Sequence, residues 1–570
     1  MAVLSRLVGS STRNLGFLHR VYPCYSSFHN HHNSQYQSRI SHPRRTVSTS
    51  SINTTTTTTS SGSISSASTK IGSGAGGQAV WQQQQRKCAT NHPSAHDHTA
   101  TAATVPPLAS QDARPGDEYV LRHLPLKALL RSLAVLSISS LPPSAMNAII
   151  RAARRHSGLI QSSRFLHYVV ERTFYDNFCL GKTRGEIERS MSELRRMGVS
   201  GTIVSFAREA SADAWPEHSV VLAENDPQLQ DWIELNLETI DRLQKGDFLA
   251  LKCTGAGAAS IKFMENWVSS SSGGKADAKL KKSLETQSKA YREASRKVCA
   301  AARDRGVGVL IDAEEDRVQA AIDELAVSLM SEFNRGGTGV VYNTYQMYLK
   351  KNQQKIRNHL RHAADNDFVL GVKMVRGAYM HTEPDRSIIH NSKADTDTAY
   401  DATARFLMLG GRVPVAAKDN ALKGGDGNGK PWKACLVLAS HNPDTVSRAL
   451  DICSRNQLST EGGGELQSLG FAQLMGMADE LSLKLVAEVR RRADLLKTGA
   501  AVPPPAVARK GDGNVLARVG LYKATIWGSL GECLLYMLRR AEENRDATAR
   551  SRDSARAIWK ELGRRMFRLA

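Results

Sequence analysis

The stretch Phe368–Tyr379, FVLGVKMVRGAY, joins an apolar and β-branched run to a charged turn. Its first eight residues are typical of a buried strand. Lys373 and Arg376 place positive charge near the C-terminal end of that run, and Gly377 permits close backbone approach to a ligand. Polar residues that close apolar strands form the binding sites of parallel α/β folds, so the number and spacing of such runs decide the fold.

Seven further runs of this kind recur along the chain, separated by longer helical stretches. They are GTIVSF from Gly201, FLALK from Phe248, VGVLID from Val307, GVVYN from Gly339, CLVLAS from Cys435, LGFAQ from Leu469 and VGLYKAT from Val519. Strands that alternate with helices pair in parallel through right-handed crossovers. Eight units within roughly 350 residues predict an α/β fold, a (βα)8 TIM barrel with insertions. A doubly wound sheet is the alternative, but no Gly-x-Gly-x-x-Gly turn follows the first strand.

Other parts of the chain flank this barrel, which we place at 198–548. Apolar residues at three- and four-residue spacing predict a helical arm over 117–197, divided at Pro142-Pro143. A C-terminal helical tail covers 549–570. Two polar insertions, SSSSGGKADAKLKK and KDNALKGGDGNGKPWK, are expected as surface loops.

The N-terminal part has a composition of its own. No Asp or Glu precedes Asp97, and Arg6, Arg13 and Arg20 alternate with apolar residues and serine. This composition predicts a mitochondrial transit peptide at 1–46, the alternative being a disordered basic tail without an address. Residues 47–116 are mostly Ser, Thr, Gly, Gln and His and are expected to be disordered.

Charge and cysteine content disfavour several classes of protein. The net charge of +21 is unevenly spread, and the basic residues are not interleaved with aromatic ones, which disfavours nucleic-acid binding. Eight cysteines without C-x-x-C spacing indicate neither a disulfide framework nor a zinc site. We expect no metal, because His441 has no second His or Cys nearby. The sequence contains no run of about 18 uncharged apolar residues, so we expect no membrane-spanning helix.

Polar residues close several of the predicted strands, and in a parallel barrel all these ends face one mouth. Each residue alone is equally consistent with a solvated loop position, but together they predict a cavity for a polar or polyanionic cofactor. They are Lys252, Asp312, Asn343, Lys373, Arg376, His441 and Asn442.

The segment Tyr536–Asn544, YMLRRAEEN, continues a predicted helix. Arg539 and Glu543 are four residues apart and suit a surface ion pair. If the helix crosses the barrel mouth, the guanidinium groups of Arg539 and Arg540, about 100° apart, can instead clamp a carboxylate.

Seven ordered motifs carry a family resemblance. They are LKCTG, LIDAEE, VVYNTYQMYLK, KMVRGAYM, ASHN, FAQLMGM and YKATIWG…YMLRRAEEN, between Thr202 and Asn544. In these motifs the chain resembles the proline dehydrogenases, flavin-dependent enzymes of proline catabolism. The resemblance implies a distorted (βα)8 barrel with FAD at the strand C-termini and a final helix over the substrate.

The resemblance also implies roles for individual residues. Arg539, Arg540 and Lys252 hold the carboxylate of proline, and Glu543 supports them. Asp312 and Tyr536 lie near the substrate, and Leu474 forms an apolar wall. Arg376 lies near the reactive nitrogen of the flavin, where a cation stabilises the reduced ring. The residues implied to bind FAD are Asn343, Lys373, Val375, Arg376, Gly377, Ala378, Tyr379, His441 and Asn442.

The implied reaction is oxidation of L-proline to 1-pyrroline-5-carboxylate, with electrons passing to ubiquinone. The implied location is the matrix side of the inner mitochondrial membrane, with peripheral contact.

One departure concerns specificity: many family members carry tyrosine where this chain has Ala524. The space beside the substrate ring then suits a hydroxyproline-preferring dehydrogenase as the alternative, unless Trp527 fills it.

Overall fold

The computed structural model describes residues 120–122, 124–207, 221–271, 278–411, 430–454, 464–497, 519–546 and 548–569. Every described residue belongs to one compact unit of the chain. The predicted transit peptide at 1–46 and the predicted disordered segment at 47–116 both lie outside the described residues.

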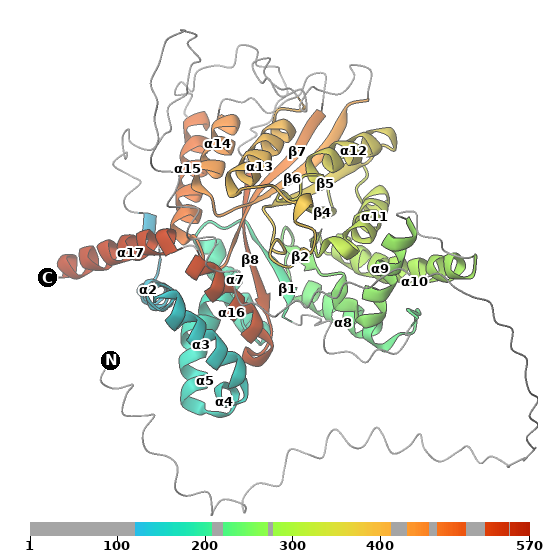
Figure 1. Cartoon of the computed structure of the whole chain (residues 1–570). Helices are drawn as coiled ribbons and strands as arrows, with labels where there is room; N and C mark the ends of the chain where they lie inside the picture. The colour runs from blue at the N-terminus through green and yellow to red at the C-terminus, as the bar shows by residue number, and fades with distance from the viewer. Residues whose placement is uncertain are drawn as a thin grey trace, which may run out of the picture. The chain divides into compact units, whose positions relative to one another are not determined.

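Eight parallel strands close into a barrel in sequence order, which confirms the predicted fold (Figure 1). They are β1 (Gly201–Phe206), β2 (Phe248–Leu251), β3 (Gly308–Ile311), β4 (Val341–Gln346), β5 (Val369–Val375), β6 (Trp432–Ala439), β7 (Gly464–Leu474) and β8 (Val519–Trp527). β8 pairs with β1 in register from Gly201↔Tyr522 to Phe206↔Trp527, so the sheet has no free edge. The prediction that β4 ends at Asn343 was wrong, because this strand continues to Gln346.

Helices follow the strands and form the outer layer. They are α8 (Pro227–Arg242), α9 (Ala258–Ser271), α10 (Ala278–Asp304), α11 (Asp316–Phe333), α12 (Asn352–Asp365), α13 (Lys393–Met408), α14 (Pro443–Ser454), α15 (Asp479–Lys497) and α16 (Leu530–Asp546), with short 3-10 turns η4 (Thr254–Ala256) and η5 (Arg386–Ile388). The described residues of the first predicted surface loop are helical, since α9 reaches Ser271 and α10 begins at Ala278. Most of the second lies outside the described residues.

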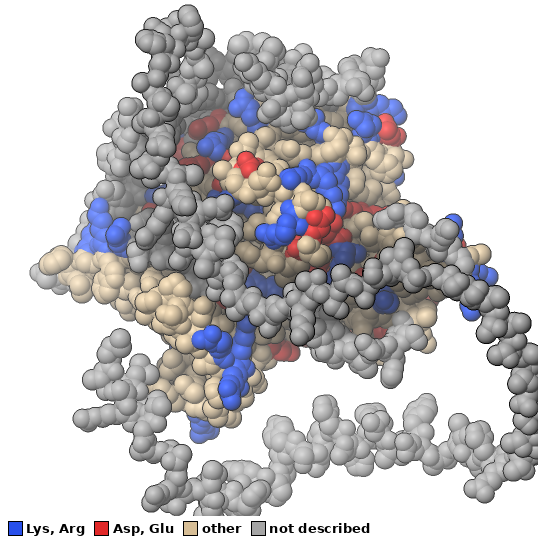
Figure 2. Space-filling model, viewed as in Figure 1, with Lys and Arg blue, Asp and Glu red and all other residues tan. Residues whose placement is uncertain are grey.

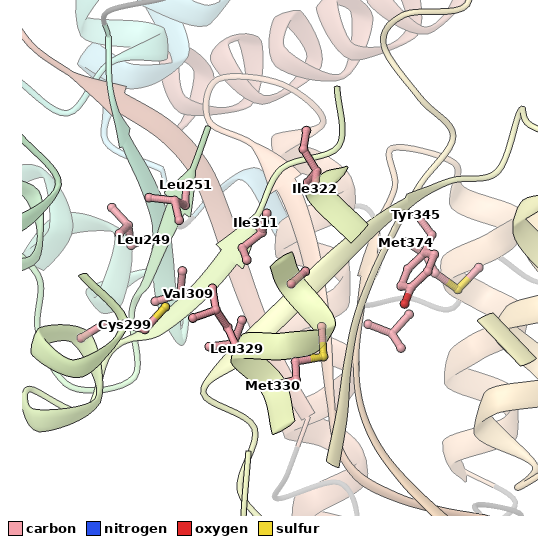
Figure 3. Close-up of a cluster of buried hydrophobic side chains, with 14 of the residues drawn as sticks. Leu249, Leu251, Cys299, Val309, Ile311, Ile322, Leu329, Met330, Tyr345 and Met374 are labelled. Atoms are coloured by element: carbon pink, nitrogen blue, oxygen red, sulfur yellow. The ribbon is translucent and has the colours of Figure 1, made fainter. Parts of the chain in front are cut away.

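Alternation along the strands separates two cores. Leu249 and Leu251 of β2, with Val309 of β3, pack outward against the helices, near Cys299 of α10 and Leu329 of α11 (Figure 3). The intervening residues fill the barrel interior: Ile203, Phe248, Ala250, Leu310, Tyr342, Val369, Cys435, Val437 and Ala472. Side chains alternate along a strand, so a residue two positions after an interior residue also points inward, toward the mouth of the barrel.

An arm of helices precedes β1. It comprises α2 (Leu126–Ser139), α3 (Pro143–Arg155), α4 (Ser157–Ser162), α5 (Arg164–Val170), the π-helical segment η2 (Glu171–Tyr175), α6 (Asp176–Phe178) and α7 (Arg184–Arg196). Pro143 begins α3, where a missing N–H has no cost. The C-terminal helix α17 (Thr548–Leu569) packs on α2 through Ile558 and Leu562. Within the described ranges no single helix is long and apolar enough to cross a bilayer, although α2 and α3, bent by 107°, meet that test as a pair.

Candidate active site

The inner face of the barrel continues upward into the predicted site residues. By parity with Ala250 and Leu310, Lys252 and Asp312 point inward from the ends of β2 and β3. Lys373 of β5 donates to Asp312 Oδ1 at 2.7 Å. β4 lies between β3 and β5, so this pair joins alternate strands of the barrel rather than neighbouring ones. The structure therefore brings these two predicted residues into direct contact.

A buried carboxyl lies beside this pair. Glu314 accepts hydrogen bonds from the backbone N–H and the hydroxyl of Thr254, at the start of η4. Burial raises the pKa of the Glu314 carboxyl above its ordinary value, and Thr254 and Lys252 partly offset that rise. Glu314 was not predicted as a site residue, although it lies two residues after Asp312 in LIDAEE.

Arg376 directly follows β5 and points into the helical layer. It donates from Nε to Asp397 at 2.5 Å, and from its two terminal nitrogens to Ser440 at 2.8 Å and to Thr445 at 3.0 Å. Its guanidinium also lies 4.6 Å from the ring centre of Tyr400. These contacts fix the direction of the guanidinium.

Asp397, on α13, is the ion-pair partner of Arg376. Burial alone would raise the pKa of this carboxyl, but hydrogen bonds from Lys393 and Arg376 hold it below its ordinary value. Asp397, Ser440 and Thr445 were missed by the sequence analysis, because they lie on other elements and share no spacing with Arg376.

The turn after β5 is held close to β4. Gly377 has φ of 127°, and a Cβ there would lie 2.0 Å from the ring of Tyr348. The N–H of Ala378 donates to Gln346 Oε1 at 3.2 Å. Ala378 is exposed, and Val375 and Tyr379 are half-buried around it. The turn thus presents backbone at the barrel mouth, where a residue with a side chain would not fit.

His441 and Asn442 follow β6 and have different contacts. His441 Nε2 accepts the backbone N–H of Leu474, the last residue of β7, at 3.2 Å. Asn442 Oδ1 accepts from the N–H groups of Asp444 and Thr445 at the start of α14. Asn442 is therefore a helix cap, and His441 joins the ends of β6 and β7. Within the described residues, no three His, Cys, Asp or Glu side chains cluster as metal ligands would.

Asn343 lies away from the mouth. It is fully buried in the middle of β4, where its Nδ2 donates to Asp323 of α11 at 2.8 Å. It belongs to the outward series of this strand, whereas Thr344 and Gln346 belong to the inward one. The Thr344 hydroxyl is buried without a partner among the described residues. Of this strand, Thr344 and Gln346 thus face the mouth in place of Asn343.

On α16, Arg540 is only 7% exposed and donates to Glu543 at 2.6 Å. Its guanidinium lies 4.7 Å from the ring centre of Tyr536. Arg539 is exposed on the neighbouring face of the helix. Within the described part of the chain, Arg540 Nε and the Tyr536 hydroxyl are buried without hydrogen-bond partners. These two groups are available to a ligand.

The helix that carries Arg540 lies beside the end of β7. Leu474 and Tyr536 both pack against one buried cluster, which includes Phe178, Met477 and Met537. Burial raises the pKa of the Tyr536 phenol well above its ordinary range, and Arg540 partly offsets this. An apolar wall and a buried guanidinium are thus placed on one side of the mouth.

β8 supplies one small and one charged residue here. Ala524 pairs in register with Leu474 and belongs to the interior core. Lys523 beside it is buried, with its ammonium on Asp479 at 2.8 Å and on the carbonyl of Met477 at 3.1 Å. Trp527 does not fill the space beside Ala524, because it packs outward and donates to Thr239 of α8 at 3.0 Å.

A separate pocket of about 690 Å³ lies between α2, η2, α7 and α15. Arg131, Arg189 and Glu193 are among its lining residues, which include none of the site residues predicted from the sequence.

Comparison with known proteins identifies similar chains. A family model described as "Proline dehydrogenase" matches residues 194–553. "Probable proline dehydrogenase, mitochondrial" of Schizosaccharomyces pombe is 25% identical over 486 residues, 78% of this chain and 90% of that protein. "Hydroxyproline dehydrogenase" of Mus musculus is 24% identical over 461 residues, 77% of this chain and 91% of that protein.

The solved structure of proline utilization A from Bdellovibrio bacteriovorus, inactivated by N-propargylglycine, matches with a TM-score of 0.46 at 16% identity. That match covers 75% of this chain, which spans 38% of the bacterial one.

Proposed function

Because the chain belongs to the proline dehydrogenase family, we propose that it oxidises L-proline to 1-pyrroline-5-carboxylate with FAD as its cofactor. The observation that carries this proposal is the buried Arg540, paired with Glu543 and placed beside the apolar wall of Leu474 and Tyr536. A cyclic amino acid presents a carboxylate and an apolar ring, and this side of the mouth offers a partner for each.

The carboxylate is bound by Arg540 with Arg539 and Lys252. The Nε of Arg540 lacks a partner among the described residues, so a substrate oxygen completes its hydrogen bonding. Glu543 holds the guanidinium at 2.6 Å and limits its rotation. Asp312, at the end of β3, holds Lys373 of β5 by an ion pair. The ring of the substrate packs on Leu474 and Tyr536, which exclude water from the carbon that is oxidised.

The cofactor assignment fits the turn after β5. The ring of Tyr348 lies where a Cβ of Gly377 would be, so this turn presents backbone rather than a side chain, and the buried Thr344 hydroxyl has no partner among the described residues. Val375, Ala378 and Tyr379 surround this turn, and Lys373 supplies positive charge. Arg376, His441 and Asn442 are held at the same edge by the contacts given above. FAD, when bound, supplies the acceptor for the hydride that leaves proline.

Apart from binding the substrate and the cofactor, the protein has few chemical tasks in this reaction. The secondary ammonium of proline gives one proton to solvent, the ring carbon next to the resulting neutral amine gives up hydride, and a C=N bond forms between nitrogen and carbon. The protein's task is to hold a neutral amine and a fixed carboxylate in a water-poor site, which positioning and electrostatics achieve without a proton-relay triad.

We further propose ubiquinone as the final electron acceptor and the matrix side of the inner mitochondrial membrane as the location. The names of the relatives support a mitochondrial location: one is called a mitochondrial proline dehydrogenase. The composition of residues 1–46 is consistent with import.

A hydroxyproline-preferring dehydrogenase is the second candidate. Ala524 lies in register with Leu474 on the inner face, Trp527 is turned away, and one relative is named a hydroxyproline dehydrogenase. Steady-state kcat/KM for L-proline and trans-4-hydroxy-L-proline separates the two. We expect Ala524→Tyr to reduce turnover of hydroxyproline more than that of proline. An equal loss for both substrates would remove Ala524 from the specificity argument.

The direct test is a visible spectrum of the purified protein before and after anaerobic addition of L-proline. We expect flavin bands that bleach with proline and persist in Arg539→Ala/Arg540→Ala. A protein that remains colourless after FAD is supplied contradicts the proposal.

A further inference from the structure

The helical arm exposes a group of large apolar side chains. Phe165 is 75% exposed, Tyr168 is 59% exposed, and Leu159 is 56% exposed. Leu166 and Val169 are exposed as well. Phe165, Tyr168 and Val169 are three and four residues apart on α5, so they share one face. Single exposed apolar residues are ordinary, but a contiguous group marks an interaction surface.

Exposed arginines lie on the same helices as this group or on the preceding one. No acidic residue lies between Glu118 and Glu171. Arg151, Arg154 and Arg155 at the end of α3 and Arg164 at the start of α5 are all exposed. Figure 1 shows α3, α4 and α5 projecting from the barrel on the side of α16, and Figure 2 shows Lys and Arg beside uncharged surface in this region. We call this surface, from Arg151 to Val169, the arm tip.

We infer that the arm tip docks on an anionic lipid bilayer, with Phe165, Tyr168 and Leu159 entering the headgroup layer and the arginines contacting lipid phosphates. Apolar anchors with a basic rim are the features of monotopic binding to such membranes. The chain's own N-terminal residues are a poor occupant, because no acid precedes Asp97 and like charges repel. This inference extends the proposed transfer of electrons to a lipid-dissolved acceptor, and it rests on that proposal.

The arm tip is directly connected to the proposed substrate helix. Arg154 pairs with Glu542 of α16 at 3.0 Å, two residues after Arg540. Gly531 of α16 lies so close to Gln161 of α4 that a Cβ there would approach it to 2.9 Å. Leu535, one turn further along α16, is 57% exposed. Docking therefore places α16 next to the bilayer, on the side from which a lipid-dissolved acceptor arrives.

The test is flotation of the purified full chain with vesicles. One set is phosphatidylcholine alone, and the other contains about one fifth phosphatidylglycerol, an anionic lipid. We expect binding to the anionic set, and a loss of about ten-fold or more in apparent affinity for Phe165→Ser/Tyr168→Ser. Arg155→Gln/Arg164→Gln is expected to weaken binding to anionic vesicles by about ten-fold and to leave the weak binding to neutral ones unchanged.

A matched control removes exposed apolar residues elsewhere. Phe567 is 83% exposed and Trp559 is 60% exposed on α17, so Trp559→Ser/Phe567→Ser deletes similar surface. We expect this variant to float like the unchanged chain. An equal loss in the control, or no loss in the arm-tip variant, overturns the assignment. So does light scattering without lipid that shows a dimer which the arm-tip variant lacks, because the surface is then a protein interface.

Flavin bleaching by proline, measured without vesicles, separates this inference from the proposed function. The arm-tip variant is expected to bleach as the unchanged chain does. Bleaching without flotation overturns the docking alone, and flotation without bleaching overturns the proposed function alone.

Discussion

At the scale of single residues, the site depends on charged groups that other side chains hold in place. Arg376 has three side-chain partners on three segments, and Arg540 has Glu543 one turn away. Charge-assisted hydrogen bonds of this kind stabilise more than neutral ones and also fix direction. The positions of these arginines are therefore set before any ligand binds.

Asp397→Asn tests the support of Arg376. At neutral pH we expect a loss of about 1 kcal/mol in the free energy of unfolding, since Asp397 is partly exposed and its ion pair is screened. The folded pKa of Asp397 lies below its ordinary value of 3.8. Its contribution is thus complete above pH 3.8 and disappears as the pH falls through the folded pKa. Urea denaturation at several pH values measures this, and a difference that grows on acidification would contradict it.

Residue identities at the site could be predicted where a motif carried them, and their partners could not. Lys373 and Asp312 were predicted separately, and the structure joins them at 2.7 Å between β5 and the end of β3. Asn343 was placed at the end of β4 because the apolar run stops there. The strand continues through polar residues because α11 and α12 satisfy them, with Asp323 bonded to Asn343 and His359 to Tyr345. Tertiary hydrogen bonds of this type leave no local signal.

At the scale of elements, the turn after β5 is the most constrained segment of the site. Gly377 combines a positive φ with the ring of Tyr348 against its α-carbon. The Tyr348 hydroxyl donates to the buried Glu383 at 2.7 Å. This hydrogen bond holds the loop after β5 against the segment that follows β4. A change at Gly377 therefore moves backbone, ring and loop together.

Gly377→Ala is expected to destabilise the fold by about 2 kcal/mol or more and to weaken FAD retention. Thermal unfolding and the flavin-to-protein absorbance ratio measure the two effects. Gly158→Ala in α4 is the matched control, because nothing lies within 4 Å of the added carbon and alanine favours a helix. Equal behaviour of the two variants would show that the turn is not constrained as described.

The order of elements was the most predictable feature. All eight strands form where short apolar runs alternate with helical periodicity, because buried parallel strands need apolar residues on both faces. Their ends were less predictable. β7 begins at Gly464, ahead of the predicted Leu469, and α10 begins inside a segment expected as a loop. The start of β7 pairs with β6 from Trp432↔Gly464 onward, and this pairing is not visible in the local sequence.

At the scale of the whole molecule, one buried carboxylate connects the helical arm to the first two strands of the barrel. The buried carboxylate of Asp247 lies just before β2. It accepts the N–H of Thr202 in β1 at 2.8 Å and the N–H of Gln244 at 2.9 Å, and it pairs with Arg195 of α7 at 2.7 Å. One side chain thus connects the arm, β1 and the approach to β2.

Asp247→Ala is expected to lower the free energy of unfolding by about 3 kcal/mol, because it leaves buried donors without an acceptor. Lys484→Ala, which removes a partly exposed ion pair to Glu480 on α15, is expected to cost less than about 1 kcal/mol. Urea denaturation of both variants measures the contrast. Similar losses would mean that Asp247 does not connect these elements as described.

The central claim is that Arg540 recognises the carboxylate of a cyclic amino acid beside the oxidising site. The most direct measurement compares anaerobic flavin reduction by L-proline and by L-prolinamide, which lacks the carboxylate charge, in the unchanged chain and in Arg540→Gln. We expect a strong preference for proline that falls by about ten-fold or more in the variant, since a charge-assisted hydrogen bond is lost. A preference for proline that survives the substitution undiminished would contradict the account.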